Sequence, residues 1–374
     1  MNDIENILNF LPAIKKMDLD KVASHSVYIG VAGFEDRALA ILDEAVWLKK
    51  KFDYVIAIEY KPFDKRNRKD EFQKKLNQLN ILDKNVKWIT YDRFEPEGFL
   101  VEFEIINKIS SHASNIIVDV SAMSKLLIIV LLQGLRNYKD KLSIIYAEAA
   151  TYHPTEEEFK AQTVKYEKET ETLPIFLTTD VFNIITTTSL STISMQGFPL
   201  LMIAFPTFNY RELIALISEI TPQHLILLEG RPHEPHNYWR LDAIRWLNRR
   251  ILEEHISIDE ILTEQERIIS TFNYKETINI LEKIYQKYKY TRRIVIVPTG
   301  SKLQTVGMFL FKQMHPDIQI IYPVTKKFAD EYTKKYKVLW EISFANLSEY
   351  MTELDEYRKE GLAKLRQAIQ SAQK

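Results

Sequence analysis

The sequence predicts an α/β fold of two tandem Rossmann-like domains, each a mostly parallel sheet flanked by helices, followed by a C-terminal helix. Three observations support this prediction. Short runs rich in β-branched residues alternate with helical patterns along most of the chain, which is typical of βαβ units. Several polar residues recur in the same order in both halves of the chain. The final stretch, residues 346–374, is charged and has apolar residues at helical spacing.

The β-branched runs predict five strands in each half. In the first half they span residues 26–31, 54–59, 86–90, 115–120 and 142–146, and in the second 200–204, 224–229, 256–258, 293–297 and 318–322. Helical patterns follow the first, second and fourth strand of each set. The most apolar run, residues 126–132, is too short to cross a bilayer, so it is predicted to be a helix buried against a sheet. A further strand is predicted at residues 338–342.

The two halves match at displacements of 170–177 residues, which predicts an internal duplication. The expected first domain spans residues 1–195, and the second spans residues 196–374 with the C-terminal helix. The matching polar residues are Arg37 and Arg211, Glu59 and Glu229, Lys61 and Arg231, Asn67 and Asn237, Ser124 and Ser301, and Lys125 and Lys302.

The composition excludes several classes of function. The 374 residues include 50 basic and 51 acidic ones, and this net charge of −1 gives no global electrostatic case for membrane or nucleic-acid binding. A local basic groove, such as the basic and aromatic segment 285–290, remains compatible with a nucleic acid. The absence of cysteine excludes disulfides, Cys-ligated zinc, iron–sulfur clusters and thiol nucleophiles. The start of the chain lacks the pattern of a secretory signal, so a cytoplasmic location is expected.

The repeated polar residues lie at the predicted carboxyl ends of strands, where open parallel sheets bind ligands. In both halves the fourth strand leads through small and hydroxyl residues to Ser-Lys at the start of a helix, a pattern that favours a phosphate. Neither segment is a Walker A motif, because the upstream glycine is missing. The predicted ligand-binding residues are Gly33, Arg37, Lys61, Asn67, Asp119, Ser121, Ser124, Lys125, Arg211, Arg231, Asn237, Thr299, Gly300, Ser301 and Lys302.

The segment Asp119-Val-Ser121-Ala-Met-Ser-Lys125 resembles the [DN]-x-[ST]-x-x-x-[RK] pattern after the fourth strand of CRISPR-associated Rossmann-fold (CARF) domains. Those domains are sensors that bind cyclic oligoadenylates, usually across a symmetric dimer. The second half departs from the pattern, because Val297 replaces the acidic residue and Thr299 precedes Lys302 by three positions rather than four. The resemblance implies a CARF-like tandem in which one chain supplies both halves of a pseudo-dimer.

The resemblance also implies a nucleotide or cyclic oligonucleotide ligand and a role in antiviral defence. CARF sensors usually carry an effector domain, and residues 326–374 are too few for one. The protein would then bind its ligand alone, act as a ring nuclease or pass its signal to an effector protein partner.

An enzymatic alternative centres on Glu59 and Glu229. Nucleoside deoxyribosyltransferase-like enzymes also place a glutamate at a Rossmann-like strand end, where it acts at the anomeric carbon. By this resemblance either glutamate would be catalytic in a hydrolase or transferase acting on a nucleotide such as NAD. No cofactor is expected, and no metal site is expected from His233 and His236, because the first half lacks both histidines. The repetition of similar groups suits a symmetric ligand better than a single reactive bond, so binding is favoured over catalysis.

Overall fold

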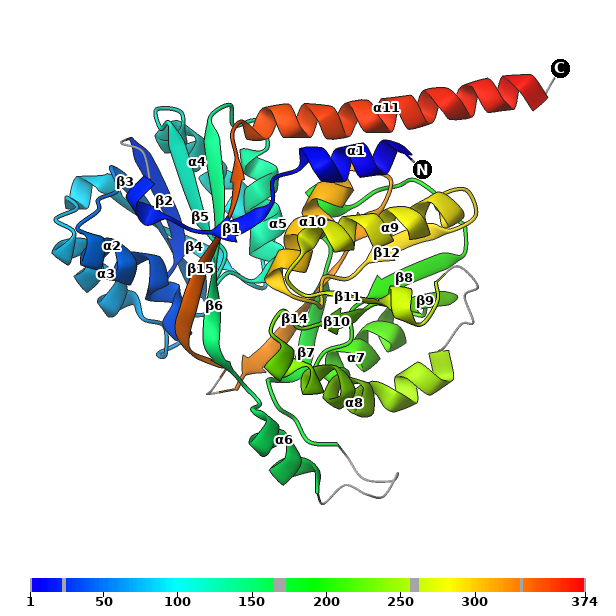
Figure 1. Cartoon of the computed structure of the whole chain (residues 1–374), viewed down its shortest axis with the longest axis horizontal. Coiled ribbons are helices and arrows are strands. Elements are labelled where there is room, and N and C mark those ends of the chain that lie inside the picture. Colours follow the sequence, from blue (N-terminus) through cyan, green and yellow to red (C-terminus); the bar gives the residue numbers. More distant parts are fainter. Residues whose placement is uncertain (1, 22–24, 165–172, 256–261, 330–331, 373–374) are drawn as a thin grey trace.

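The computed structural model describes residues 2–21, 25–164, 173–255, 262–329 and 332–372, which form two α/β halves lying side by side (Figure 1). The first half is built on a seven-stranded sheet of order β1-β15-β6-β5-β2-β3-β4. Its strands are β1 (Ile14–Lys16), β15 (Thr333–Phe344), β6 (Lys141–Tyr152), β5 (Asn115–Asp119), β2 (Ser26–Val31), β3 (Tyr54–Lys61) and β4 (Val86–Asp92).

Five strands of this sheet, β6-β5-β2-β3-β4, are parallel, whereas β15 and β1 run antiparallel to their neighbours. Numbered along the chain, the parallel strands have the order 5-4-1-2-3, which is the Rossmann order. Both central strands, β2 and β5, are fully buried, which explains their nearly continuous apolar sequences. The helices of this half are α2 (Ala40–Leu48), α3 (Lys69–Gln78), α4 (Phe103–Ser110) and α5 (Lys125–Leu135).

The second half has a smaller parallel sheet of order β13-β12-β8-β9. Its strands are β13 (Gln319–Ile320), β12 (Arg293–Ile296), β8 (Leu200–Ala204) and β9 (His224–Leu227); directly after β9, β10 (Glu229–Arg231) pairs in parallel with β11 (Ile268–Ser270). Its helices are α7 (Tyr210–Ile220), α8 (Trp239–His255), α9 (Tyr274–Tyr288) and α10 (Lys302–Met314). The strand order therefore matches that of the first half. Rossmann-like units share this order in general, so the duplication itself stays a prediction.

The strands predicted from β-branched runs are present wherever the structure describes their residues. The predicted strand at residues 256–258 lies outside the described residues, and β11 occupies the third position in the second half. The apolar run 126–132 lies within α5, where it is buried, as predicted. The strand predicted at 338–342 lies within β15, and the C-terminal helix is α11 (Leu347–Ala372), which lies beside α1 (Asn2–Phe10) in Figure 1.

The two halves exchange strands, a feature that the sequence did not predict. After β6 and α6 (Glu156–Thr163), the chain forms β7 (Thr178–Ile185), which pairs antiparallel with β14 (Tyr322–Phe328) of the second half. The chain then returns from β14 into β15, which pairs antiparallel with β6 of the first half. A cut at residue 195 would therefore separate paired strands on both sides.

The contact between α5 and α10 lies at the centre of the molecule (Figure 1). Buried side chains of both helices, including Leu127 and Leu131 of α5 and Val306 and Leu310 of α10, belong to one continuous apolar core that spans both halves. The amide of Gln313 also donates to the side-chain oxygen of Gln133 at 2.7 Å across this contact. The two halves thus share a core as well as strands.

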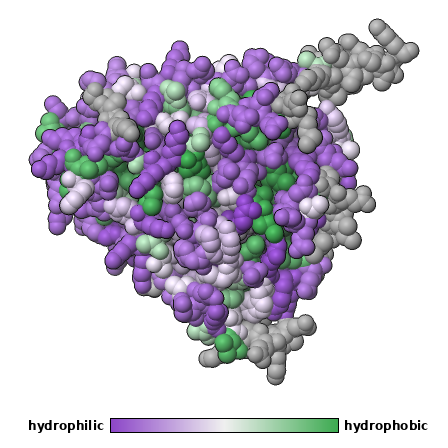
Figure 2. All heavy atoms as spheres, in the orientation of Figure 1, coloured by the Kyte–Doolittle hydropathy of each residue, from purple (hydrophilic) through white to green (hydrophobic). Residues whose placement is uncertain are grey.

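The outer surface is mainly polar. Figure 2 shows hydrophilic side chains over most of one face, with hydrophobic ones in small separate groups. Within the described residues, no helix combines the length and the apolar character that crossing a membrane requires.

The strand exchange predicts that a core change in β15 destabilises the whole chain. Ile342 is 1% exposed and lies opposite Ile144 of β6. Ile342→Ala should lower the free energy of unfolding by about 2–4 kcal/mol, through lost apolar burial and a residual cavity. Urea unfolding followed by circular dichroism and by tryptophan fluorescence should show one shared transition shifted to lower urea. Ile193→Ala is the matched control, because Ile193 is 90% exposed; two separate transitions would contradict the shared core.

Candidate ligand-binding site

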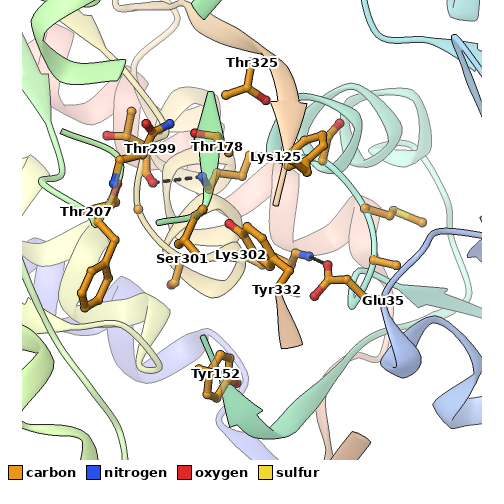
Figure 3. Close-up of a pocket in the computed structure, with 18 of the residues that line it drawn as sticks. Glu35, Lys125, Tyr152, Thr178, Thr207, Thr299, Ser301, Lys302, Thr325 and Tyr332 are labelled. Atoms are coloured by element: carbon orange, nitrogen blue, oxygen red, sulfur yellow. Dashed lines mark hydrogen bonds and ion pairs between the residues drawn. The ribbon is translucent and has the colours of Figure 1, made fainter. Parts of the chain in front are cut away.

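A cavity of about 360 Å³ lies where the strand ends of the two halves meet (Figure 3). Its walls come from the loops after the first and second strands of each half, from the starts of α5 and α10, and from β6 and β14. Residues that match between the halves line it together. These pairs are Phe34 and Phe208, Pro62 and Pro232, Asp64 and Glu234, Asn67 and Asn237, Ser124 and Ser301, Lys125 and Lys302, and Tyr146 and Tyr322.

A serine cap places a lysine at the start of each central helix. The hydroxyl of Ser124 accepts a hydrogen bond from the amide of Leu127 at 3.2 Å, and that of Ser301 accepts one from Gln304 at 3.0 Å. As a result, α5 begins at Lys125 and α10 at Lys302. A positive side chain is unfavourable at the positive end of a helix dipole, and two such lysines in one cavity favour an anionic ligand.

Each lysine reaches across to the other half. The ammonium of Lys125 donates to the carbonyl of Thr299 at 2.9 Å, and the ammonium of Lys302 donates to the carbonyl of Ser121 at 2.5 Å. Figure 3 shows Lys125 and Lys302 entering the same space from their two helices. Ser121 and Thr299 both follow the fourth strand of their halves, so the two contacts are reciprocal.

A buried carboxylate accompanies each lysine. Lys302 Nζ lies 3.4 Å from Glu35 of the first half, and that carboxylate is also bound by Arg37 and Thr333, each at 2.8 Å. Burial raises the pKa of Glu35, but the charges of Arg37 and Lys302 outweigh this effect and leave the pKa below its ordinary value. Burial lowers the pKa of Lys302 to about 8, with Glu35 acting in the opposite direction.

The second lysine has a related environment. Burial lowers the pKa of Lys125, an effect opposed by the charge of Glu212 in the second half. Burial likewise raises the pKa of Glu212, which its interactions with Lys125 and Asn209 oppose. Each lysine therefore faces a carboxylate from the other half. A ligand phosphate in this cavity would lie among largely desolvated charges, where electrostatic contacts are stronger than in water.

Aromatic side chains form much of the remaining wall. They are Phe34, Tyr60, Tyr146, Tyr152, Phe208, Phe272, Tyr322, Phe328 and Tyr332. The rings of Phe34 and Phe328 lie 5.6 Å apart, so residues from the two halves meet here as well. The hydroxyl of Tyr60 accepts from the amide of Ser124 at 2.5 Å and donates to the carbonyl of Ala122 at 3.2 Å.

Most of the residues predicted to bind a ligand line this cavity. They are Gly33, Arg37, Asn67, Ser124, Lys125, Asn237, Thr299, Gly300, Ser301 and Lys302. The two serine hydroxyls already cap their helices, so they hold the helix starts in place. The side-chain nitrogen of Asn67 is buried with no hydrogen-bond partner among the described residues, which makes it available to a ligand.

The other predicted residues lie outside the cavity lining. Asp119 is buried beneath it and accepts from the Tyr28 hydroxyl at 3.0 Å and the Ser121 amide at 2.9 Å. The Ser121 hydroxyl accepts from the amide of Ala147 at 2.8 Å, so its carbonyl is the group that meets Lys302. Lys61 lies 3.8 Å from Asp92 and Arg231 lies 3.3 Å from Glu276, both at the surface, and Arg211 donates to the Tyr210 hydroxyl at 3.4 Å.

Both glutamates of the enzymatic alternative form ion pairs outside the cavity lining. Glu59 is bound by Lys69 at 2.7 Å, and Glu229 by Arg245 through two contacts at 2.7 and 2.5 Å. The described residues contain no group of three His, Cys, Asp or Glu side chains placed to hold a metal ion.

Sequence reasoning missed Glu35, Glu212, Arg93, Arg240 and the aromatic wall. Glu35 stands inside the repeated segment that begins at Phe34, but its counterpart is Asn209, so matching between halves did not select it. Tyr146 and Tyr322 lie in a matched segment and could have been found by the same comparison. Nothing in the local sequence of Arg93 or Arg240 indicates that these residues face the cavity.

No protein-family model matches the chain, and no curated protein matches it. Among solved structures, a protein described as a universal stress protein from Pseudomonas aeruginosa UCBPP-PA14 aligns over 91% of this chain and 99% of its own, with 10% identity and a TM-score of 0.23. Haemonchus contortus phosphoethanolamine N-methyltransferase 1, in complex with phosphoethanolamine and S-adenosylhomocysteine, aligns over 79% of this chain and 72% of its own, with 10% identity and a TM-score of 0.19. Likenesses this low carry no argument about function.

The buried Asp119 predicts a specific dependence of stability on pH. Burial raises its pKa to about 6, against the hydrogen bonds from Ser121 and Tyr28. An aspartate in the unfolded chain has a pKa of about 3.9. The folded state therefore holds this proton more tightly, and the group lowers the free energy of unfolding as the pH rises from about 4 to about 6.

Asp119→Asn keeps a hydrogen-bond acceptor but cannot ionise. Its stability relative to the wild type should therefore rise by about 2–3 kcal/mol between about pH 4 and pH 7. Urea unfolding of both proteins across this range measures the difference. A difference that stays constant with pH would show that Asp119 does not titrate as its burial implies.

Proposed function

We propose that the protein binds a phosphate-bearing, nucleotide-derived ligand in the cavity between its halves and acts as a sensor or regulator. The reciprocal placement of Lys125 and Lys302 supports this proposal most directly. Both lysines stand at helix starts, both are largely withdrawn from water, and both enter one cavity. Each ammonium donates to a backbone carbonyl, and Lys302 also lies 3.4 Å from Glu35; a phosphate would add a charge-assisted contact to both lysines.

The cost of burying the lysines points to an anion. Desolvation lowers the pKa of both groups, so burying two ammonium groups in the cavity lowers the stability of the folded protein. The charge of Lys125 is among the causes that lower the pKa of Lys302, so the two groups are close enough to repel each other. A phosphodiester between them would neutralise this repulsion and accept hydrogen bonds from both.

The aromatic wall suits nucleobases. A base presents a flat π-face that stacks on Tyr and Phe rings with little dependence on its identity. The cavity places such rings on β6 and on β14, among them the matched pair Tyr146 and Tyr322. A ligand with a phosphate and two bases could use both the lysines and the rings of both strands.

The CARF resemblance makes the proposal more specific. By that resemblance the ligand would be a cyclic oligonucleotide and the protein would act in antiviral defence, passing its signal to an effector protein. Of the segment that carries the resemblance, Ser124 and Lys125 line the cavity, which supports the ligand-binding part of this proposal.

Loss of either lysine should weaken nucleotide binding. Lys125→Ala or Lys302→Ala removes a charge-assisted contact, so affinity should fall about tenfold or more. A thermal-shift panel of mono-, linear di- and cyclic dinucleotides and NAD identifies a ligand, and calorimetry then measures the variants. Lys61→Ala is the control, because Lys61 was predicted from sequence yet lies outside the lining. A wild type that no nucleotide stabilises would overturn the proposal.

Binding without turnover is the expected behaviour. Glu59 and Glu229 are held by Lys69 and Arg245, so neither is free to act on a ligand in the cavity. Chromatography of each bound nucleotide after incubation with the pure protein should return it unchanged. A new product, lost in Glu59→Gln or Glu229→Gln, would establish the enzymatic alternative instead.

A further inference from the structure

The third-strand ends of the two halves occupy equivalent positions but differ in chemistry. Arg93 follows β4, and its amide donates to the carbonyl of Lys61 at 2.9 Å. Thr271 follows β11, and its amide donates to the carbonyl of Arg231, also at 2.9 Å. Lys61 and Arg231 are themselves a matched pair in the sequence, and both Arg93 and Thr271 line the cavity. One half thus offers a cation where the other offers a hydroxyl.

The guanidinium of Arg93 has no hydrogen bond or ion pair with any residue that the structure describes. It is half-buried and packs over the rings of Phe328, at 5.2 Å, and Phe94, at 5.7 Å. The other two arginines of the lining are occupied. Arg37 binds Glu35 at 2.8 Å, and Arg240 donates to the carbonyls of Tyr152, His153 and Pro154 at 2.7–3.3 Å. The hydrogen-bond donors of Arg93 therefore remain for a ligand.

Nearby groups support an anion site at Arg93. Asp64 is the acid of this loop, but its carboxylate is bound by Arg66 at 2.7–3.1 Å. The pKa of Asp64 is lowered mainly by these bonds and to a smaller extent by the charge of Arg93. Asn67, whose amide donates to the Asp64 carbonyl at 3.0 Å, adds the buried side-chain nitrogen that lacks a partner. The guanidinium of Arg93 and the side-chain nitrogen of Asn67 are thus two donors, without partners among the described residues, near the loop that holds Asp64.

Thr271, the corresponding residue of the second half, is uncharged, and both its hydroxyl and its carbonyl already form hydrogen bonds. The hydroxyl of Thr271 donates to the Arg231 carbonyl at 3.1 Å, and its own carbonyl accepts from the Ser301 hydroxyl at 2.5 Å. Tyr60 and Glu35 of the first half correspond to Gly230 and Asn209 of the second. The cavity therefore repeats its lysines and its aromatic rings, but the lining arginine whose guanidinium has no polar partner among the described residues lies on one side only.

We propose that the ligand lacks two-fold symmetry and carries a terminal phosphate that Arg93 binds at the first-half end of the cavity. This inference rests on the proposed function, a phosphate-bearing nucleotide ligand, and specifies a linear dinucleotide with a phosphorylated end in place of the cyclic oligonucleotide that the CARF resemblance implies. The phosphodiester lies between Lys125 and Lys302, and the terminal phosphate receives the fork of donors that arginine presents to phosphate oxygens. A two-fold symmetric ring has no end group to place there.

Calorimetry with two linear dinucleotides tests this inference. The probes are ApA and its 5′-phosphorylated form pApA, which differ by the terminal phosphate. The affinity of the wild type for pApA should exceed its affinity for ApA by about tenfold or more. Arg93→Ala should abolish this preference, so that pApA binds no more tightly than ApA, and Arg93→Lys should restore part of it. Thr271→Ala, the change at the matched position, should keep the full preference.

Equal affinities of the wild type for pApA and ApA would overturn the inference, as would a preference that persists in Arg93→Ala. In either case a loss of ApA binding in Lys125→Ala and Lys302→Ala would leave the proposed function standing. A wild type that binds neither dinucleotide would overturn this inference, and the proposed function would stand only if another nucleotide of the thermal-shift panel stabilises the protein. The thermal melting temperature of each variant separates loss of a contact from loss of the fold.

Discussion

The exchange of strands between the halves is the constraint on which the rest of the structure depends. Strand β15 completes the first sheet against β6, and β7 pairs with β14 on the other side. Because backbone hydrogen bonds link the halves in both directions, neither half keeps its strand pairing without the other. The same exchange brings β6 and β14 over the junction, so the residues on these strands line the cavity rather than an outer edge.

The shared core fixes the geometry of the charged groups. Helices α5 and α10 pack against each other, and their first turns point their lysines into the space between the sheets. Each lysine donates to a carbonyl across the junction; Lys302 also lies 3.4 Å from Glu35, and the charge of Glu212 acts on the pKa of Lys125. Buried charges of this kind are retained at a cost in stability, which is typical of a functional site rather than of a structural one. Because the lysines bridge the halves, a ligand that takes over their contacts would act on both halves at once.

The cavity repeats its scaffold more closely than its charges. The serine caps, the lysines and the paired aromatic residues recur, since they depend on the strand ends and helix starts that the two halves share. Arg93 against Thr271 and Glu35 against Asn209 break the repetition at positions where the backbone is equivalent. A common backbone with different side chains is the arrangement expected of a site that binds one ligand in one orientation.

Local patterns in the sequence were enough to predict the parallel strands, the buried helix α5 and the Ser-Lys helix starts. Each of these depends on a short stretch: a run of β-branched residues buried on both faces, or a serine that caps the helix it precedes. The same reasoning could identify candidate residues at strand ends, and many of them line the cavity. It could not distinguish Ser124 and Lys125 from Glu59 and Lys61. Both pairs of residues lie at or after the end of a strand, but the first pair lines the cavity, whereas the second forms ion pairs outside the lining.

The tertiary structure decided which of those strand ends meet. Pairing of β15 with β6 joins residues almost 200 positions apart, and no local pattern records it. The packing of Arg93 over Phe328 and the burial that lowers the pKa of Lys302 follow from contacts between distant segments. The partners of Glu59 and Glu229, Lys69 and Arg245, lie on the helices that follow their strands, and only the folded chain shows that these pairs form. Sequence periodicity reports which face of an element is buried, whereas charge pairing and cavity shape depend on what the fold places opposite that face.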